Sequence, residues 1–227
     1  MIIKDFQIKK IIDERKGFLP FLFYGPNEGL IRDHISKIKS DYLSDVDFEE
    51  VSLTGKSLDL NPDTLETSAN SISMFNSYKL IILESLKDKN MSELENVINS
   101  APAQTMMIIK ADNLKKTSKL RKLFESNSMC YALACYEDDA KSMMRLIDNF
   151  VKENNIAFDR DIKNYLMQTL STDRMISSNE LQKISLFYTN ADTPPNLEEI
   201  KNLLNDTSSN NLQKMNESVM YGNTTKS

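Results

Sequence analysis

A glycine turn near the start of the chain has the layout of a phosphate-binding loop without its chemistry. The apolar run Phe21–Tyr24 enters the turn, and a helical pattern follows it. In a working loop, G-x-x-x-x-G-K-[ST], backbone amides cradle the phosphates, the lysine reaches the β- and γ-phosphates, and the hydroxyl holds Mg²⁺. Counted from Gly25, the last three positions hold Leu30, Ile31 and Arg32. The sequence therefore predicts a degenerate phosphate loop with no bound cofactor, made of Gly25, Pro26, Asn27, Glu28 and Gly29.

Other catalytic chemistries find little support in the residue types present. His34 is the only histidine, so a Ser or Cys triad with a histidine base would have to use it. Its place inside the helix after the turn favours a surface or partly buried helix residue instead. Cys130 and Cys135, together with one remote histidine, match no zinc-ligand spacing and are predicted to be buried thiols. We expect no catalytic residue and no metal site.

Three consecutive carboxylates, Glu137-Asp138-Asp139, form the densest acidic group. Paired carboxylates can serve as acid and base when burial separates their pKa values. The same residues also suit the first turn of a helix, where the helix dipole favours negative charge. The second interpretation is preferred.

A basic cluster precedes and enters a predicted helix, and it consists of Lys115, Lys116, Lys119, Arg121 and Lys122. It could contact phosphates or an acidic partner, or it could be a solvated helix face. The chain has no tryptophan, and no aromatic residue interleaves with the cluster, so stacking on single-stranded nucleic acid is not indicated. The net charge of −5 also argues against nonspecific coating of DNA.

Met74 and Phe75 end a predicted helical segment whose apolar face is Leu65, Ala69 and Ile72. Met74 lies off that face. A Met-Phe pair at a helix end can fill a pocket on a partner, or it can pack into the protein's own core. Both interpretations stay open on these residues alone.

The elements that must position these residues alternate in the first half of the chain. Apolar runs predict five strands, at Phe21–Tyr24, Val46–Leu53, Lys79–Leu83, Thr105–Ile109 and Met129–Cys135. Val46–Leu53 contains acids and is expected to be the more peripheral strand. Helix-length segments separate the runs, and Asp63 with Glu66 predicts a capping-box-like helix start. Alternating strands and helices predict βαβ units in a mostly parallel α/β sheet.

After about Tyr136 the pattern becomes helical throughout. Predicted helices cover Asp138–Asn154, with Met144, Ile147 and Val151 in phase, then Asp159–Leu170, Ser178–Tyr188 and a segment after Pro194. A polar stretch follows, and Leu212, Met215 and Val219 begin one more amphipathic helix. We expect an α/β domain over residues 1–139, a small helical domain over 140–206, and the start of a truncated helical domain over 207–227. A frayed natural terminus is the alternative for the last part.

Composition places few further limits on function. The chain has 227 residues, and its 27% charged and 40% hydrophobic residues are typical of a globular protein. The first residues lack the apolar core of a signal peptide, and no apolar run approaches the length of a membrane helix. We therefore expect a cytoplasmic protein with no membrane partner.

Several segments, taken in order, resemble the delta subunit of the bacterial DNA polymerase III clamp loader, in a form like that of the alphaproteobacteria. The segments that carry the resemblance are Phe23–Arg32, Ser73-Met74-Phe75, Ala111–Glu125, Ala134–Asp139, Asp173-Arg174-Met175, Glu180-Leu181 and Lys183. Each is weak alone, but their order and spacing cover nearly the whole chain. Asn76-Ser77-Tyr78 departs from the family, in which a glycine and an arginine often follow the apolar pair.

The resemblance implies a fold, a function and partners. It implies a RecA-like/AAA+-type P-loop NTPase fold with a degenerate nucleotide site, then a small lid-like helical domain and a helical collar. It also implies that Met74 and Phe75 enter the pocket of the sliding clamp (the beta subunit) and help to open it during DNA replication. The implied partners are the ATPase subunits gamma/tau, delta-prime and, indirectly, primed DNA. Such a chain is an accessory subunit of a DNA-directed DNA polymerase, itself a nucleotidyltransferase. The alternatives are an active AAA+ or RecA-like ATPase and a scaffold subunit without clamp contact.

Overall fold

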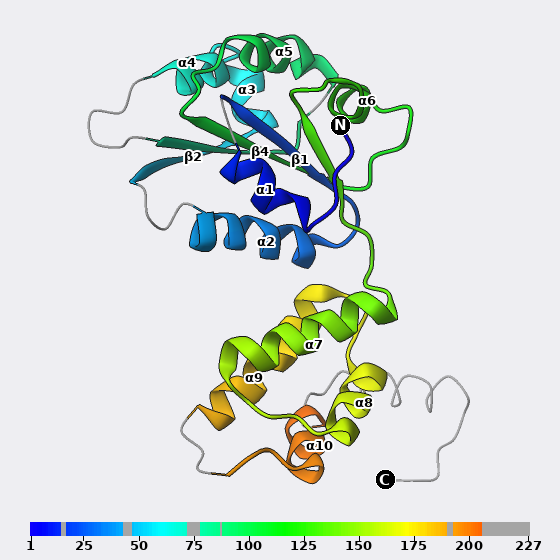
Figure 1. Ribbon diagram of the computed structural model, residues 1–227. Helices are drawn as coiled ribbons and strands as arrows, with labels where there is room; N and C mark the ends of the chain where they lie inside the picture. Colours follow the sequence, from blue (N-terminus) through cyan, green and yellow to red (C-terminus); the bar gives the residue numbers. More distant parts are fainter. Residues whose placement is uncertain (15–16, 43–46, 72–77, 87, 190–192, 206–227) are drawn as a thin grey trace. The chain divides into compact units, whose positions relative to one another are not determined.

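The computed structural model describes the chain except for residues 15–16, 43–46, 72–77, 87, 190–192 and 206–227 (Figure 1). The chain divides into two compact units, Met1–Glu137 and Asp138–Ser227. The predicted assignment of domains to residues 1–139, 140–206 and 207–227 stays a prediction, since the last part lies outside the described residues.

The first unit is built on a five-stranded sheet in which all strands are parallel. The strands are β1 (Leu19–Tyr24), β2 (Phe48–Thr54), β3 (Tyr78–Glu84), β4 (Thr105–Ala111) and β5 (Tyr131–Ala134). Their order is β2-β3-β4-β1-β5, so each of the five predicted runs forms a strand and β2 lies at an edge, as its acids indicated. The predicted α/β fold class is confirmed.

Helices cover both faces of this sheet (Figure 1). On one face lie α1 (Gln7–Asp13) and α2 (Glu28–Lys37), the latter continuing into a π-helical turn at Ile38–Tyr42. On the other lie α3 (Gly55–Leu60), α4 (Thr64–Asn70), α5 (Met91–Ser100) and α6 (Lys119–Ser126). Strand β1 is buried along its whole length because side chains pointing to either face meet a helix layer. Phe21 and Phe23 enter one core, and Leu22 and Tyr24 enter the other.

The helix predictions hold for the long segments and fail at some short ones. Helices α1 and α3 were not predicted, although Ile8 and Ile12 of α1 are four residues apart and both buried. The predicted cap at Asp63 is wrong: its backbone is helical and its side chain makes no capping hydrogen bond. The capping box lies instead at the start of α3, between Thr54 and Ser57.

The second unit consists of helices around its own core. They are α7 (Ala140–Asn154), α8 (Arg160–Thr169), α9 (Arg174–Tyr188) and α10 (Leu197–Asn205). The buried stripe of α7 runs through Met143, Ile147 and Phe150, whereas the predicted members Met144 and Val151 are half-buried. Of the three residues predicted to share the buried face, only Ile147 is fully buried. The other two buried residues of α7 each come one position before the predicted ones.

Aspartates begin three of these helices. The Asp139 side chain accepts a hydrogen bond from the Ser142 amide at 2.7 Å, and Asp159 and Asp173 cap α8 and α9 in the same way. The predicted helix beginning near Leu212 lies outside the described residues. No helix in the described part of the chain is both long and apolar enough to span a membrane.

Candidate functional site

The turn after β1 lies where a parallel α/β sheet usually binds its ligand. Strand β1 has β4 on one side and β5 on the other, so the chain changes direction across the sheet at this point. Ligands of open parallel sheets bind outside the carboxyl ends of strands at such a switch point. The loop that begins at Gly25 occupies it here.

Gly25 allows a neighbouring strand end to approach this loop closely. Its φ of +143° is a conformation that residues with a side chain rarely adopt. A Cβ at this position would lie 2.0 Å from the carbonyl oxygen of Cys135, which follows β5. The space beside the turn is therefore filled by backbone.

Backbone amides of the loop donate hydrogen bonds to carbonyl oxygens at the ends of neighbouring strands. The Gly25 amide donates to the Ala111 oxygen at 3.3 Å, and the Asn27 amide donates to the Cys135 oxygen at 3.2 Å. The Cys135 amide in turn donates to the Tyr24 oxygen at 2.7 Å. Amides that would cradle a phosphate in a working loop are thus bonded to the ends of β4 and β5.

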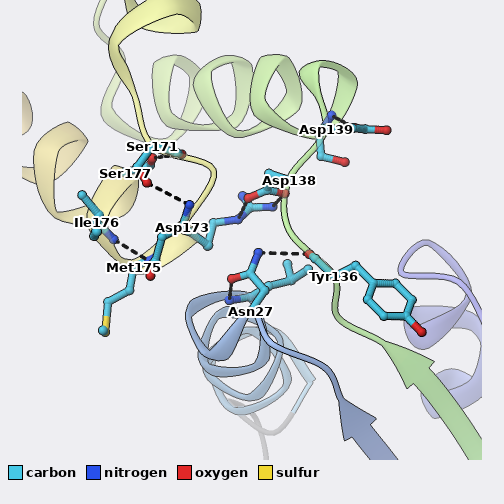
Figure 2. A network of polar contacts seen from close by, with 12 residues as sticks. Asn27, Tyr136, Asp138, Asp139, Ser171, Asp173, Met175, Ile176 and Ser177 are labelled. Carbon is cyan, nitrogen blue, oxygen red and sulfur yellow. Dashed lines mark hydrogen bonds and ion pairs between the residues drawn. The ribbon is translucent and has the colours of Figure 1, made fainter. Parts of the chain in front are cut away.

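The side chain of Asn27 makes two further hydrogen bonds at this turn (Figure 2). Its Oδ1 accepts a hydrogen bond from the Leu30 amide at 3.0 Å, which caps the start of α2. Its Nδ2 donates to the carbonyl oxygen of Tyr136 at 3.1 Å. One buried amide side chain therefore joins the start of α2 to the segment after β5.

A working phosphate loop has a lysine followed by a serine or threonine, and the residues at these two positions are unsuited to binding phosphate here. Ile31 is buried in the core between α2 and the sheet, and Arg32 is exposed on the helix. Glu28, in the first turn of α2, is exposed and negatively charged. Of the predicted loop residues, Gly25, Pro26 and Asn27 form the turn, and Glu28 and Gly29 begin α2.

Arg121 of the basic cluster is engaged within the protein. Its Nε lies 2.7 Å from Glu125 Oε1, its Nη1 donates to the Leu114 oxygen at 3.1 Å, and its guanidinium stacks 4.9 Å from the centre of the Tyr24 ring. Burial, only partly offset by Arg121, raises the pKa of Tyr24 to about 12, so its hydroxyl stays protonated and donates to Glu125. Lys115, Lys116, Lys119 and Lys122 are exposed, and their role as a binding face stays a prediction.

Met74 and Phe75, the predicted clamp contacts, lie outside the described residues. The elements on either side are described: α4 ends at Asn70, and β3 begins at Tyr78. Leu65 and Ala69 of α4 are buried as predicted.

The remaining candidates have structural roles. His34 is more buried than predicted: its ring packs on Phe23, and its Nδ1 lies 3.4 Å from an Asp5 carboxylate oxygen. Cys130 and Cys135 are buried, as predicted, and burial raises the pKa of the Cys130 thiol to about 11. Within the described residues, no group of three His, Cys, Asp or Glu side chains could hold a metal ion.

Two residues of the acidic triplet, Asp138 and Asp139, have different structural roles. Asp139 caps α7, and the hydrogen bond from the Ser142 amide lowers the pKa of its carboxyl. Asp138 is buried, and its Oδ2 and Oδ1 lie 2.8 and 2.9 Å from Nε and Nη2 of Arg174 (Figure 2). The sequence did not reveal this pairing, although both residues belong to the segments that carry the family resemblance.

A shallow groove of about 310 Å³ lies beside α2. Charged side chains line much of it, but Lys39 pairs with Glu50 at 2.7 Å and Lys110 pairs with Glu84 at 2.6 Å. Because the opposite charges are already adjacent, the groove offers no strong field of one sign.

The parallel sheet, its strand order and the degenerate loop define the class: a RecA-like, AAA+-type α/β fold. Solved structures agree on this fold. The Bacillus subtilis DNA clamp loader delta protein superimposes with a TM-score of 0.57 at 18% identity, over 86% of this chain and 61% of that one. The Thermotoga maritima RuvB Holliday junction branch migration motor gives 0.56 at 14% identity, over 89% and 69%.

Within that class, the sequence is similar to DNA polymerase III delta subunits. Residues 21–133 match the family model described as DNA polymerase III, delta subunit. A probable DNA polymerase III subunit delta from Rickettsia prowazekii is 25% identical over 166 residues, which is 73% of this chain and 50% of the relative. The chain thus spans about half the length of that curated relative. The resemblance inferred from the sequence is confirmed.

Proposed function

We propose that this chain is a clamp-loader subunit that binds and opens the sliding clamp during DNA replication and does not hydrolyse ATP itself. ATPase subunits of the gamma/tau type would supply the energy, with delta-prime and, indirectly, primed DNA as further partners. The observation that carries the proposal is the closed turn after β1 in a chain similar to this family, because it combines the NTPase fold with a blocked phosphate position.

Three features of the turn support the proposed absence of nucleotide chemistry. The amides of Gly25 and Asn27 are already bonded to strand ends. The position of the phosphate-binding lysine holds Ile31, which is buried in the core. The Cys135 carbonyl lies against Gly25, where its negative partial charge would repel a phosphate.

Isothermal titration with Mg-ATP tests this half of the proposal. We expect no saturable heat and no phosphate release. Micromolar binding that is abolished by a change at Gly25 or Gly29 would instead support the alternative of an active ATPase.

Clamp opening needs binding energy rather than catalysis. A subunit that binds the open ring more tightly than the closed ring shifts the population by its differential affinity. A difference of about 5.5 kcal/mol moves a 1:99 equilibrium to 99:1. Met74 and Phe75 are the proposed principal contacts because apolar anchors dominate interface energies.

Surface plasmon resonance on immobilised clamp tests the contact. Truncating each anchor costs about 2 kcal/mol or more, so Met74→Ala with Phe75→Ala should weaken binding roughly a thousandfold. The melting temperature should change little if the pair is exposed in the free protein. Unchanged clamp binding with a large fall in melting temperature would show that the pair belongs to the protein's own core. Unchanged binding and unchanged stability would favour the scaffold alternative.

The exposed lysines of the basic cluster, Lys115, Lys116, Lys119 and Lys122, are proposed as a face for an acidic partner or DNA. Changing all four to glutamine should reduce assembly with loader subunits or primed DNA, most clearly at low salt. No change in either interaction at low salt would leave them as a solvated helix face.

A further inference from the structure

Four exposed lysines of the basic cluster give part of the first unit a surface of a single charge sign. This lysine surface consists of Lys115 and Lys116, in the loop after β4, and Lys119 and Lys122, in the first turns of α6. Within the residues that the structure describes, none of the four lies within ion-pair distance of a carboxylate. Asp112 is the only acid between the end of β4 and Lys122, so positive charge is in excess.

Arg121 differs from these lysines because its guanidinium is bonded inside the protein. Its side chain is 12% exposed, and its Nε lies 2.7 Å from Glu125 Oε1. Its Nη1 donates to the carbonyl oxygen of Leu114, the residue before Lys115, at 3.1 Å. The planar fork of arginine makes both contacts at once, which the compact ammonium of lysine cannot do in the same geometry. The side chain of Arg121 therefore holds the loop against α6.

Two further hydrogen bonds order the same loop. The Ser118 amide donates to the Lys115 oxygen at 3.0 Å. The Ser118 Oγ accepts from the Arg121 amide at 3.4 Å and so caps the start of α6. The lysines are thus attached to an ordered backbone, which lowers the conformational cost of binding a ligand.

The surroundings of the lysine surface favour a chain of phosphates over a protein partner. Protein interfaces draw most of their energy from buried apolar and aromatic anchors. Residues 112–126 offer none, because Leu120 and Phe124 are buried and Leu114 and Leu123 pack against the core. Binding to a DNA backbone needs no such anchor, since it comes from neutralised phosphates and released counterions. Single-stranded DNA would also need exposed aromatic rings for stacking, and the only aromatic residue of this segment is the buried Phe124.

We propose that the lysine surface binds the phosphate backbone of duplex DNA independently of base sequence, and that Arg121 is the positioning residue that presents it. This inference rests on the proposed function, which leaves the partner of the face open between DNA and an acidic protein. Arg121 makes no phosphate contact in this arrangement, because Glu125 and Leu114 hold its guanidinium. When the loop is in place in only a fraction of molecules, the apparent dissociation constant rises by the inverse of that fraction.

Fluorescence anisotropy of the isolated chain with a labelled DNA duplex of about 20 base pairs, at several salt concentrations, tests the surface. For four phosphate contacts, the logarithm of the binding constant should fall against the logarithm of salt with a slope of about −3.6. Changing all four lysines to glutamine should bring the slope close to zero. The charge-matched control changes four other exposed lysines to glutamine and should leave the slope as in wild type. These are Lys9, Lys10, Lys56 and Lys152.

Two variants distinguish positioning by Arg121 from direct contact with DNA. Arg121→Lys keeps the charge but loses the fork, and Arg121→Met removes the charge. Both should weaken binding roughly threefold, as for a competent fraction of about one third, with the slope of wild type. A direct phosphate contact would instead spare Arg121→Lys and make the slope of Arg121→Met shallower by about 0.9. Arg160→Lys, at an exposed arginine that begins α8, is the control and should change neither quantity.

Hydrogen exchange of the same proteins measures the order of the loop itself. The Ser118 amide is bonded to the Lys115 oxygen, so it should exchange faster in both Arg121 variants than in wild type. The comparison is made at a temperature where all melting curves show folded protein. Wild-type affinity or wild-type exchange in the folded variants would overturn the positioning role.

Other outcomes would overturn the DNA surface. A slope that survives the change of all four lysines would show that DNA binds elsewhere. Polyglutamate bound as tightly as the duplex would assign the surface to an acidic protein. Clamp binding is measured separately, so DNA binding without clamp binding would refute clamp opening and support this inference, whereas clamp binding without DNA binding would refute this inference alone.

Discussion

The turn after β1 and the start of the helical unit both bury polar groups, but they satisfy them with different atoms. At the turn, neutral backbone groups of Gly25 and Asn27 bond to the ends of β4 and β5. At the start of the helical unit, the buried Asp138 carboxylate meets the guanidinium of Arg174 in two short contacts. Figure 2 shows the Asn27 side chain with its bond to Tyr136, and it also shows Asp138.

This difference determines how each region responds to mutation. Backbone hydrogen bonds remain whatever the side chain, so those of the turn should be lost only where a new atom would push the strands apart. A buried ion pair depends on both side chains, and removal of one leaves the other charge without compensation. The turn should therefore have one critical residue, and the ion pair should have two.

The largest effect is expected for Gly25→Ala. The new Cβ would lie 2.0 Å from the Cys135 oxygen in a backbone conformation that alanine rarely adopts. The backbone must move, and we expect a loss of roughly 3–5 kcal/mol in the free energy of unfolding. Urea denaturation measures it. Gly17→Ala is the control, because beyond the residue itself and its two chain neighbours no atom lies within 4 Å of the corresponding Cβ, and it should change stability by less than about 0.5 kcal/mol. Equal stability of the two variants would contradict the closed turn.

The next largest effect is expected for Arg174→Met, which leaves the Asp138 carboxylate buried. The loss should be about 3 kcal/mol, measured by denaturation followed through the helical signal. Lys163→Met breaks an ion pair with Asp148 at 2.7 Å that is substantially exposed, and it should cost about 0–1 kcal/mol. If both variants lose the same stability, Asp138 and Arg174 are no more coupled than a surface pair.

The smallest effect on stability is expected at Asn27, where two variants distinguish the two hydrogen bonds of its side chain. Asn27→Ala removes the cap of α2 and the bond to Tyr136, and should cost roughly 1–2 kcal/mol. Asn27→Asp retains the capping oxygen but removes the donor, so it should recover part of that loss. Thermal melts of the three proteins give the comparison. Equal stability of the aspartate and alanine variants would show that the Tyr136 bond, rather than the cap, dominates.

Local signals predicted the long elements correctly. The five apolar runs became strands because a sheet covered on both faces needs continuous apolar sequence. The short helices were harder. In α3 the capping box uses serine at the third position rather than glutamate or glutamine, and α1 is only two turns long. Asp63 has a cap-like spacing, but its backbone is already helical and its side chain makes no capping hydrogen bond.

The sequence alone determined that this chain has the alternating pattern of a parallel α/β fold and lacks the lysine and hydroxyl of a phosphate loop, because residue types and spacing are local properties. The tertiary structure decided what fills the loop, which charges are buried and which acceptors the buried Lys79 meets. Cys135 approaches Gly25 from 110 residues away, Arg174 meets Asp138 across 36 residues, and Lys79 reaches back eight residues to Ser71. Such contacts depend on where folding brings distant backbone, and no local pattern encodes them.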